Sequence, residues 1–572
     1  MKLERLPEYV LSAVVVAIGL LFAVYAGKLT GEAQVNRVLM ILACMVLIAI
    51  VTKAKQLIWM AIPISFPLLS TLPFLPLPFS TRDLWVLIAL GAYFVFKALK
   101  IVRGKPKYDF TDFVLLLNLL YLASAFVRNP TGTEAMGSAR VGGRPYVDVI
   151  IACLAYWVLV RSDLPIRYAR RLLYFVVLAT TIEAGLVALI NFVPSIGGIL
   201  VQYFNDTYLT LNISITGGEA QAAEMERTGR LGFLSPMAIN SLLCLVSIFP
   251  PITLVNPIYF GRFVAFLLTG FSLLFSGFRS MFIQFGGYFC LSSYFKGGVL
   301  RIVPLYTVSL CFLIIIAFAN GTIFDLPLAV QRTLCFLPGH WDEDAVLDAR
   351  ASSQWRFEMW EQVLGTDKYI HNRVLGDGFG LDKRTLDENI QLDLLSQHIG
   401  GGSQAMQENF MRTGDFHSGP LSLLRTVGYV GGALFYWLLF AAMGRAWRLI
   451  RKCHNTPYLP IALFYGLPLI VNPIFFTLII GAFRDNIRDV IFWLGMLKVI
   501  ESSLEKSSLL PDEKPASLRP VDLRRRVPGQ APARTFGSAR LLPYIGEKAD
   551  NLSSEADIDS TQQSIKPVAV AL

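Results

Sequence analysis

The chain contains about fourteen runs of mostly apolar residues, and their lengths constrain its fold more than any other feature. A transmembrane helix needs roughly 20 consecutive apolar residues. Charged residues make up 16% of the chain, whereas a soluble globular protein has about 25%. We therefore predict an all-α polytopic membrane protein of about 12–14 transmembrane helices. The apolar runs are 9–27, 34–52, 57–79, 83–99, 110–127, 146–161, 172–194, 235–256, 259–276, 280–297, 300–320, 420–443, 459–481 and 486–500.

The distribution of charge predicts the orientation of these helices. Basic clusters at 97–107, 161–171 and 444–452 fall on one side of the predicted topology, and an excess of Lys and Arg marks cytoplasmic loops. The polar segments 195–234 and 321–419 fall on the opposite side, and the second has 15 acidic and 8 basic residues. The net charge of +10 is therefore a topology signal, and it does not indicate binding to nucleic acid.

The same pattern divides the chain into four parts. Residues 1–320 are expected to form a transmembrane bundle, and residues 321–419 a large extracytoplasmic loop with helices of its own. Residues 420–500 are expected to add the last transmembrane helices. Residues 501–572 change to a Pro-, Ser- and Arg-rich composition, which is typical of a disordered cytoplasmic tail.

One helix of the large loop is predicted at 352–365. Ser352 or Ser353 can cap its start, and Gly365 can end it. Arg356 lies beside an apolar face, either as a surface arginine or as part of a site. That face consists of Trp355, Met359 and Val363, which recur every four residues.

Arg279, in the motif "FSGFRS", stands between two apolar runs on the side of the large loop. An arginine near a membrane segment either reaches the lipid headgroups or serves a function. A guanidinium suits bidentate binding of phosphate. An anionic ligand at the membrane surface would account for both Arg279 and Arg356.

Several other patterns predict no site. The acidic triplet 342–344 has the composition of a divalent-ion site, but a solvated loop is the better interpretation. The glycines of "GDGFG" (376–380) favour a tight turn and match neither a P-loop nor a dinucleotide fingerprint. The chain lacks a His-Glu-x-x-His zinc motif and a Gly-x-Ser-x-Gly hydrolase motif. We expect neither a metal nor a cofactor.

Taken in order, four motifs follow one another over residues 235–440: "SGFRS", "RFEMW", "GDGFG" and a loop-ending histidine before "VGYVGG". This order resembles the O-antigen ligase and O-antigen polymerase superfamily of bacterial membrane glycosyltransferases. The resemblance implies an enzyme of the inner membrane with its active site facing the periplasm. It would move a glycan from undecaprenyl diphosphate to an acceptor hydroxyl, without a metal.

The resemblance also implies roles for individual residues. Arg279 and Arg356 would bind the diphosphate, and His417 would remove the acceptor proton as general base. Trp360, Gly378 and Gly380 would support the site. The family often has His-Asn at the position of His417-Ser418, and a His-Asn pair occurs at His371-Asn372, so His371 is the alternative base.

The acceptor and the class of function remain open at this stage. An O-antigen ligase, with the lipid A core as acceptor, is preferred. An O-antigen or exopolysaccharide polymerase and a protein O-oligosaccharyltransferase are alternatives within the superfamily. A polysaccharide or lipid transporter is the alternative from another class, and it would need ionisable residues inside the spans, such as Glu183.

Overall fold

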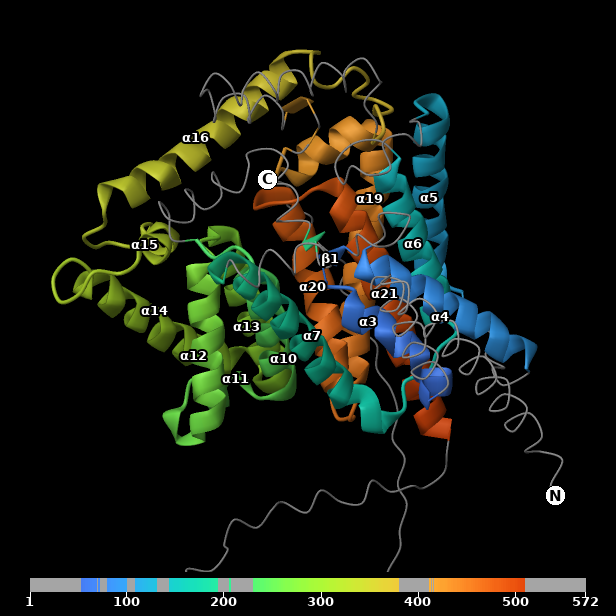
Figure 1. Cartoon of the computed structure of the whole chain (residues 1–572), viewed down its shortest axis with the longest axis horizontal. Coiled ribbons are helices and arrows are strands. Elements are labelled where there is room, and N and C mark those ends of the chain that lie inside the picture. Colours follow the sequence, from blue (N-terminus) through green and yellow to red (C-terminus); the bar gives the residue numbers. More distant parts are fainter. Residues whose placement is uncertain are drawn as a thin grey trace, which may run out of the picture. The chain divides into compact units, whose positions relative to one another are not determined.

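The computed structural model describes most of the apolar chain. The described residues are 53–68, 70–71, 80–99, 108–130, 143–193, 205–206, 230–379, 411–412, 414 and 416–509. The predicted spans 9–27 and 34–52, Gly380 and the tail from residue 510 lie outside them. The elements are η2 (Lys55–Met60), α3 (Ala61–Ser65), β1 (Ser70–Thr71), α4 (Thr81–Ala98), α5 (Phe110–Arg128), α6 (Arg144–Leu159), α7 (Ile166–Phe192), β2 (Asn205–Asp206), α10 (Leu234–Ile248), α11 (Pro251–Leu254), η4 (Pro257–Tyr259), α12 (Phe260–Phe275), α13 (Arg279–Gly297), η5 (Val299–Arg301), α14 (Ile302–Ala319), α15 (Leu328–Leu334), α16 (Glu343–Gly365), α19 (Gly419–Lys452), α20 (Leu459–Leu478) and α21 (Phe483–Leu509) (Figure 1).

Six helical segments within the described part of the chain are long and apolar enough to cross a membrane. They are α5, α7, η4 with α12, α14, α19 and α20. The predicted helical architecture with several apolar helices of membrane-spanning length is therefore confirmed, and their insertion in a membrane stays a prediction. The larger count of 12–14 spans stays a prediction, since two of the expected spans lie outside the described residues. The other described apolar runs form helices that are shorter, carry more charge or are less apolar.

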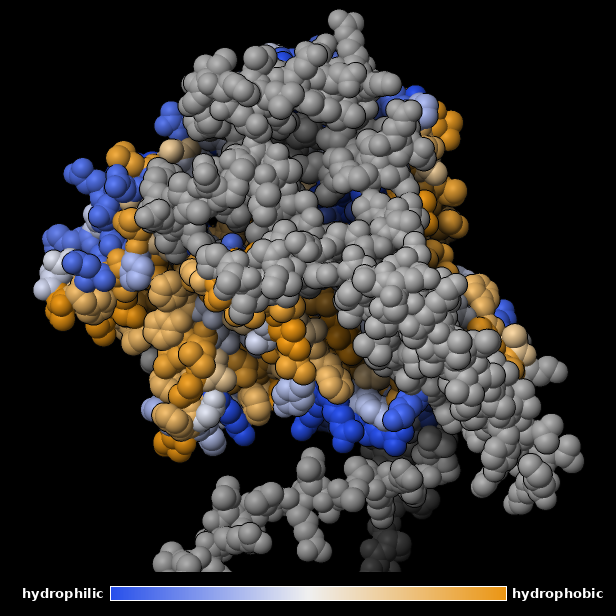
Figure 2. Space-filling view, viewed as in Figure 1, coloured by the Kyte–Doolittle hydropathy of each residue, from blue (hydrophilic) through white to orange (hydrophobic). Residues whose placement is uncertain are grey.

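Two of these helices, α12 and α14, expose most of their apolar surface. Figure 2 shows hydrophobic side chains over this region, with hydrophilic side chains at the lower edge of the view. Lipid tails can cover such a surface, whereas water cannot do so without a large free-energy cost. The exposed residues include Phe260, Leu268, Phe271, Val303, Leu310, Phe312, Ile315 and Phe318.

The core lies among helices from distant parts of the sequence. α19 packs against α20, α5 and α21, and α21 packs against α6. One continuous apolar cluster joins these helices, with fully buried side chains such as Phe435, Ile461 and Val490. α21 continues to Leu509, past the expected start of the tail at 501. Ser503 explains part of this extension, because its buried hydroxyl accepts a hydrogen bond from the backbone N–H of Leu164 at 2.8 Å.

Short polar motifs start two of the helices. Ser80 and Asp83 form a capping box at the start of α4, and Asp109 and Asp112 form one at the start of α5. In each box, two side chains satisfy backbone N–H groups that the helix itself leaves without partners. The same carboxylates also belong to ionic networks inside the bundle.

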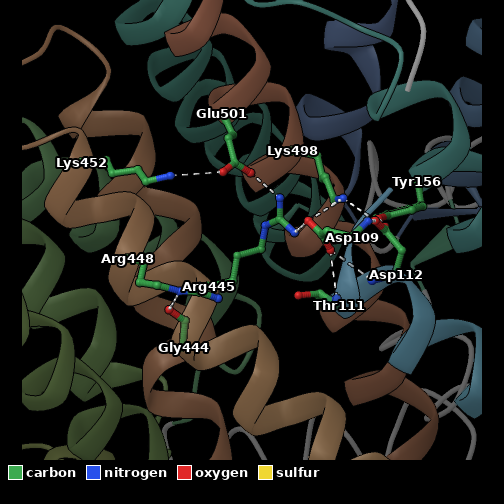
Figure 3. A network of polar contacts seen from close by, with 10 residues as sticks. All are labelled: Asp109, Thr111, Asp112, Tyr156, Gly444, Arg445, Arg448, Lys452, Lys498 and Glu501. Carbon is green, nitrogen blue, oxygen red and sulfur yellow. Dashed lines mark hydrogen bonds and ion pairs between the residues drawn. The ribbon is translucent and has the colours of Figure 1, made fainter. Parts of the chain in front are cut away.

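One of these networks joins α5, α6, α19 and α21 (Figure 3). It lies near the end of α19, and α16 lies near the start of that helix (Figure 1). Lys498 donates to Asp109 at 2.9 Å and also to Asp112. Arg445 donates to Asp109 and to Glu501, and the Tyr156 hydroxyl donates to Asp112. Lys498 and Arg445 are each 7% exposed. These buried cations are stable there because each has carboxylate partners.

The network changes the ionisation of Asp109. Burial alone would raise the pKa of this carboxyl, but Lys498 and Arg445 hold its pKa well below the ordinary value. A carboxyl with a lowered folded-state pKa stabilises the fold above its unfolded-state pKa of about 4. This stabilisation is present at neutral pH and is lost as the pH falls below about 4.

Replacing Lys498 with methionine is expected to lower the free energy of unfolding by about 3–5 kcal/mol. The change removes the cation and leaves Asp112, whose side chain is 10% exposed, as a buried charge with one partner fewer. Thermal unfolding in detergent measures the loss. Lys506→Met is the control, because its pair with Asp163 is exposed and is worth at most about 1 kcal/mol. Equal effects of the two substitutions would contradict the prediction.

Candidate functional site

α16 organises the candidate site. It begins at Glu343, and its N-cap Asp342 accepts a hydrogen bond from the backbone N–H of Asp344. The predicted start at Ser352 or Ser353 is therefore wrong, because the acidic triplet caps the helix nine residues earlier. The predicted end at Gly365 is confirmed. The triplet is neither a solvated loop nor a separate element, since it forms the first turn of α16.

Arg279 and Arg356 are brought together. Arg279 is the first residue of α13 and donates to the backbone carbonyl of Ala349 in α16 at 3.0 Å. Burial lowers the pKa of Arg356, and the like charge of Arg279 lowers it further. Neither is paired with a carboxylate among the described residues. Two neighbouring cations without a counter-ion repel each other, and an anion between them would remove that repulsion.

Two further arginines stand beside this pair. Arg230 donates to Asp348 of α16 at 2.6 Å, and Arg332 of α15 pairs with the same carboxylate. Arg279 and Asp348 also act in opposite directions on the pKa of the nearby Cys335 thiol, which burial raises. Asp348 thus offsets one of the two positive charges of Arg230 and Arg332, and it forms no ion pair with Arg279 or Arg356. Sequence reasoning missed these two arginines, because their partner is fixed only by the packing of α15 on α16.

The turn before Arg279 explains the glycine of "SGFRS". Gly277 has a φ of +72°, and a Cβ atom there would lie 2.8 Å from Cγ of Arg230. The residue is therefore required both by its backbone conformation and by the close approach of Arg230. No side chain caps the start of α13, where Phe278 is the N-cap residue. The free N–H groups and positive end of α13 add to an electropositive site.

His417 lies at the start of α19 and has an unusual backbone. Its φ is +47°, and it is the only non-glycine residue with a positive φ in the described part of the chain. Such a conformation is sparsely populated by side-chain-bearing residues and tends to occur at functional sites. The preceding residue, Phe416, is fully buried and anchors the turn.

α16 connects the His417 turn with the arginine pair. Phe416 packs in one apolar cluster with Met359 and Val363 of α16, and Trp360 packs against the same cluster. Met359 is three residues from Arg356, which is about one helical turn. The predicted apolar face of Trp355, Met359 and Val363 is confirmed, and the supporting role implied for Trp360 stays a prediction.

His371, the alternative base, has a different environment. Its side chain is 79% exposed, and its Nδ1 lies 3.6 Å from Oδ2 of Asp377. Asp377 instead accepts hydrogen bonds from the backbone N–H groups of His371 and Asn372 at 2.8 and 2.9 Å. These contacts indicate a structural turn at 371–377. The described geometry therefore favours His417, which is only partly exposed.

The glycine-rich segment pairs with an interruption in α19. The helix has a non-helical residue at Gly428, and residues 373–378 follow the backbone around this point. The N–H groups of Asp377 and Gly378 donate to the carbonyls of Arg425 and Thr426 at 2.6 and 2.9 Å. Gly378 also has a positive φ, and a Cβ there would lie 2.8 Å from the Tyr146 hydroxyl. The predicted tight turn is confirmed for residues 376–378, which pair with the backbone of α19.

Replacing Gly428 with alanine is expected to destabilise the protein by about 1–3 kcal/mol or more. Gly428 has a φ of +64°, and a Cβ there would collide with the carbonyl of Val374 and lie 2.6 Å from the N atom of Gly376. Thermal unfolding in detergent measures the effect. Gly444→Ala in the same helix is the control, because no atom lies within 4 Å of its added Cβ. That change should be neutral or stabilising, and a loss of stability as large as that of Gly428→Ala would refute the explanation.

Arg425 is a second residue that sequence reasoning missed. It is 6% exposed and donates to the carbonyl of Arg412 at 3.1 Å. Its guanidinium also lies against Gly414, where an added Cβ would collide with it. Arg425 thus holds the segment before α19 through its contacts with Arg412 and Gly414. A buried arginine in an otherwise apolar run was the signal that could have identified it.

The remaining predicted residues lie elsewhere or outside the description. Glu183 is 8% exposed within α7, where it was the candidate for a transport path. Gly380 falls among residues that the structure does not describe, so its predicted role is untested. No known protein-family model and no curated protein matches this chain.

Proposed function

We propose that the chain is a membrane glycosyltransferase that uses a lipid-linked glycan diphosphate as donor. The observation that carries the proposal is the arginine pair Arg279 and Arg356: Arg279 begins α13 and contacts α16, the helix that carries Arg356, and neither has a carboxylate partner among the described residues. A diphosphate has the charge and the oxygen geometry that two guanidinium groups bind best. The apolar surface of α12 and α14 suits a donor with a lipid tail.

The chemistry follows from the positions of the groups. A sugar hydroxyl is a weak nucleophile, and a general base activates it by accepting its proton in the transition state. His417 serves as that base, on the turn that packs against α16 together with the helix turn after Arg356. As the glycosidic bond to the diphosphate breaks, negative charge grows on the leaving group, and Arg279 and Arg356 stabilise it. Direct displacement by the acceptor oxygen would invert the anomeric configuration.

The finer assignment extends the resemblance of the motifs. The donor would be an undecaprenyl-diphosphate-linked glycan, and the acceptor the lipid A core, as in an O-antigen ligase of the bacterial inner membrane. The active site would face the periplasm. Polymerase and protein O-oligosaccharyltransferase activities would use the same donor chemistry and differ only in the acceptor.

The test is a transfer assay with the purified full-length chain in lipid nanodiscs. Undecaprenyl-diphosphate-linked glycan is supplied as donor, with lipid A core as acceptor in one reaction and with donor alone in another. Glycan attached to lipid A core would establish ligase activity, and longer chains on the carrier would establish polymerase activity. A third reaction contains a serine-rich acceptor protein. If the donor stays intact in all three reactions, the chain is not a glycosyltransferase of this class.

A further inference from the structure

Eight charged side chains meet where the first turns of α4, α6 and α21 converge, and the proposed mechanism uses none of them. We refer to them as the charged cluster. Four are arginines and four are aspartates, so their formal charges cancel. Ionisable groups inside a membrane bundle are costly, which makes a functional role the first hypothesis for them. The members are Arg82, Asp83, Arg144, Asp148, Arg484, Asp485, Arg488 and Asp489.

Three of the arginines have hydrogen-bond partners within the cluster. Arg484 donates to Asp485 at 3.3 and 3.4 Å. Arg144 donates to Asp83 and, at 2.9 Å, to Asp148. Arg488 donates to Asp485 and to Asp489, each at 3.0 Å. These pairs account for the stability of most of the cluster.

Arg82 is the exception. Its side chain is 9% exposed, and its Nε lies 3.6 Å from Oδ1 of Asp83, which is too far for a hydrogen bond. No hydrogen bond from Arg82 to any other residue occurs in the described part of the chain. Oδ1 of Asp83 is likewise buried without a hydrogen bond. The guanidinium of Arg82 has five N–H donors, and none of them has a hydrogen-bond partner among the described residues.

Arg82 faces a second arginine of the cluster. The guanidinium carbons of Arg82 and Arg488 lie 5.5 and 6.0 Å from the centroid of the Phe66 ring. Burial and the like charge of Arg488 lower the pKa of Arg82. The donors of Arg82 thus lie beside α21, whose Asp485 and Asp489 are 40% and 28% exposed.

This arrangement selects the chemistry of a ligand. Exposed aspartates repel an anion, and the arginines repel a cation. A hydroxyl group both donates and accepts hydrogen bonds, so a neutral polyhydroxyl compound can accept from Arg82 and donate to Asp485 or Asp489. We propose that the charged cluster is a sugar-binding subsite that holds the hydroxyl groups of a glycan. This inference rests on the proposed function, since it assigns the glycan of that reaction to the cluster.

The position of the cluster fits such a subsite. Phe483, which directly precedes Arg484, donates its backbone N–H to the Ser422 hydroxyl at 2.9 Å. The N–H of Ser422 in turn donates to the carbonyl of Ser418 at 3.0 Å, in the turn that follows His417. The start of α21 is therefore attached to the His417 turn. A glycan bound by the cluster would therefore lie along the start of α21, with one end near His417.

The experiment measures glycan binding directly. The probe is the oligosaccharide freed by mild acid from the lipid-linked donor, titrated into the full-length chain in nanodiscs by calorimetry. Asp485→Asn and Asp489→Asn are expected to weaken binding about tenfold or more, because each removes a charged hydrogen-bond acceptor. Asp163→Asn is the control, since Asp163 lies at the opposite end of the bundle in an exposed pair with Lys506. It should bind as the wild type does.

The same titration separates this inference from the proposed function. His417→Ala should retain full binding of the oligosaccharide, even if transfer is lost or never occurs. Unfolding temperatures of both cluster variants exclude a loss of fold as the cause, and the less connected Asp489 provides the result if Asp485→Asn is unstable. Wild-type protein that does not bind the probe at millimolar concentration, or folded cluster variants that bind it as tightly as wild type, would overturn the inference.

Discussion

Replacing His417 with asparagine is expected to lower the rate constant of glycan transfer by about 10²–10⁴-fold, the usual contribution of a general base. Asparagine is the informative replacement because it tolerates the positive φ that His417 has better than most residues do. The substitution keeps the backbone turn at residue 417 and removes the imidazole that accepts the proton. The affinity for the donor should change little, because the diphosphate is bound by other groups. Initial rates at saturating donor and acceptor measure the effect.

A variant of the other candidate histidine provides the comparison for this prediction. His371→Ala should retain near-normal rates, because this side chain is 79% exposed and its loop is held by Asp377 through backbone N–H groups. A large loss in His371→Ala with a normal rate in His417→Asn would reverse the assignment of the two histidines.

The pattern of hydrophobic residues predicted the helices well where burial of apolar side chains is the main source of their stability. The runs at 110–127, 172–194, 259–276, 300–320, 420–443 and 459–481 all correspond to helices that are long and apolar enough to span a membrane. The start of α16 was missed because its first nine residues, "EDAVLDARA", have little apolar periodicity. Asp342 and the acidic first turn stabilise that part locally.

The candidate site was only partly predictable, for a different reason. Arg279 and Arg356 stand out in the sequence because each lies beside an apolar stretch. Arg230 and Arg332 do not, since their role depends on a shared contact with Asp348 between segments far apart in the chain. Likewise, the glycines of 376–380 suggested a turn, but not that Gly376 packs against an interruption at Gly428. Tertiary packing decides such pairings, and single-sequence patterns carry little information about them.

Replacing Arg356 with glutamine is expected to lower the rate constant of transfer by about 10²–10³-fold, the usual cost of removing one donor to a developing anion. Arg356 is a sharper test than Arg279, because Arg279 also donates to the carbonyl of Ala349 and its loss disturbs the docking of α16. Stability should fall little or even rise in Arg356→Gln, since the substitution relieves repulsion from Arg279. Rates and unfolding temperatures on the same preparations separate the two effects.

Inorganic diphosphate provides a second readout for Arg356 that does not depend on the acceptor. It should inhibit the wild type competitively with the donor and inhibit Arg356→Gln much more weakly. Arg356→Lys should recover only part of the activity, because an ammonium group keeps the charge but loses the bidentate geometry. Arg448→Gln, an exposed arginine at the opposite end of the bundle that donates to Gly444, controls for the loss of one positive charge. Because the arginine pair carries the proposed function, normal rates and normal inhibition in Arg356→Gln would remove its main support.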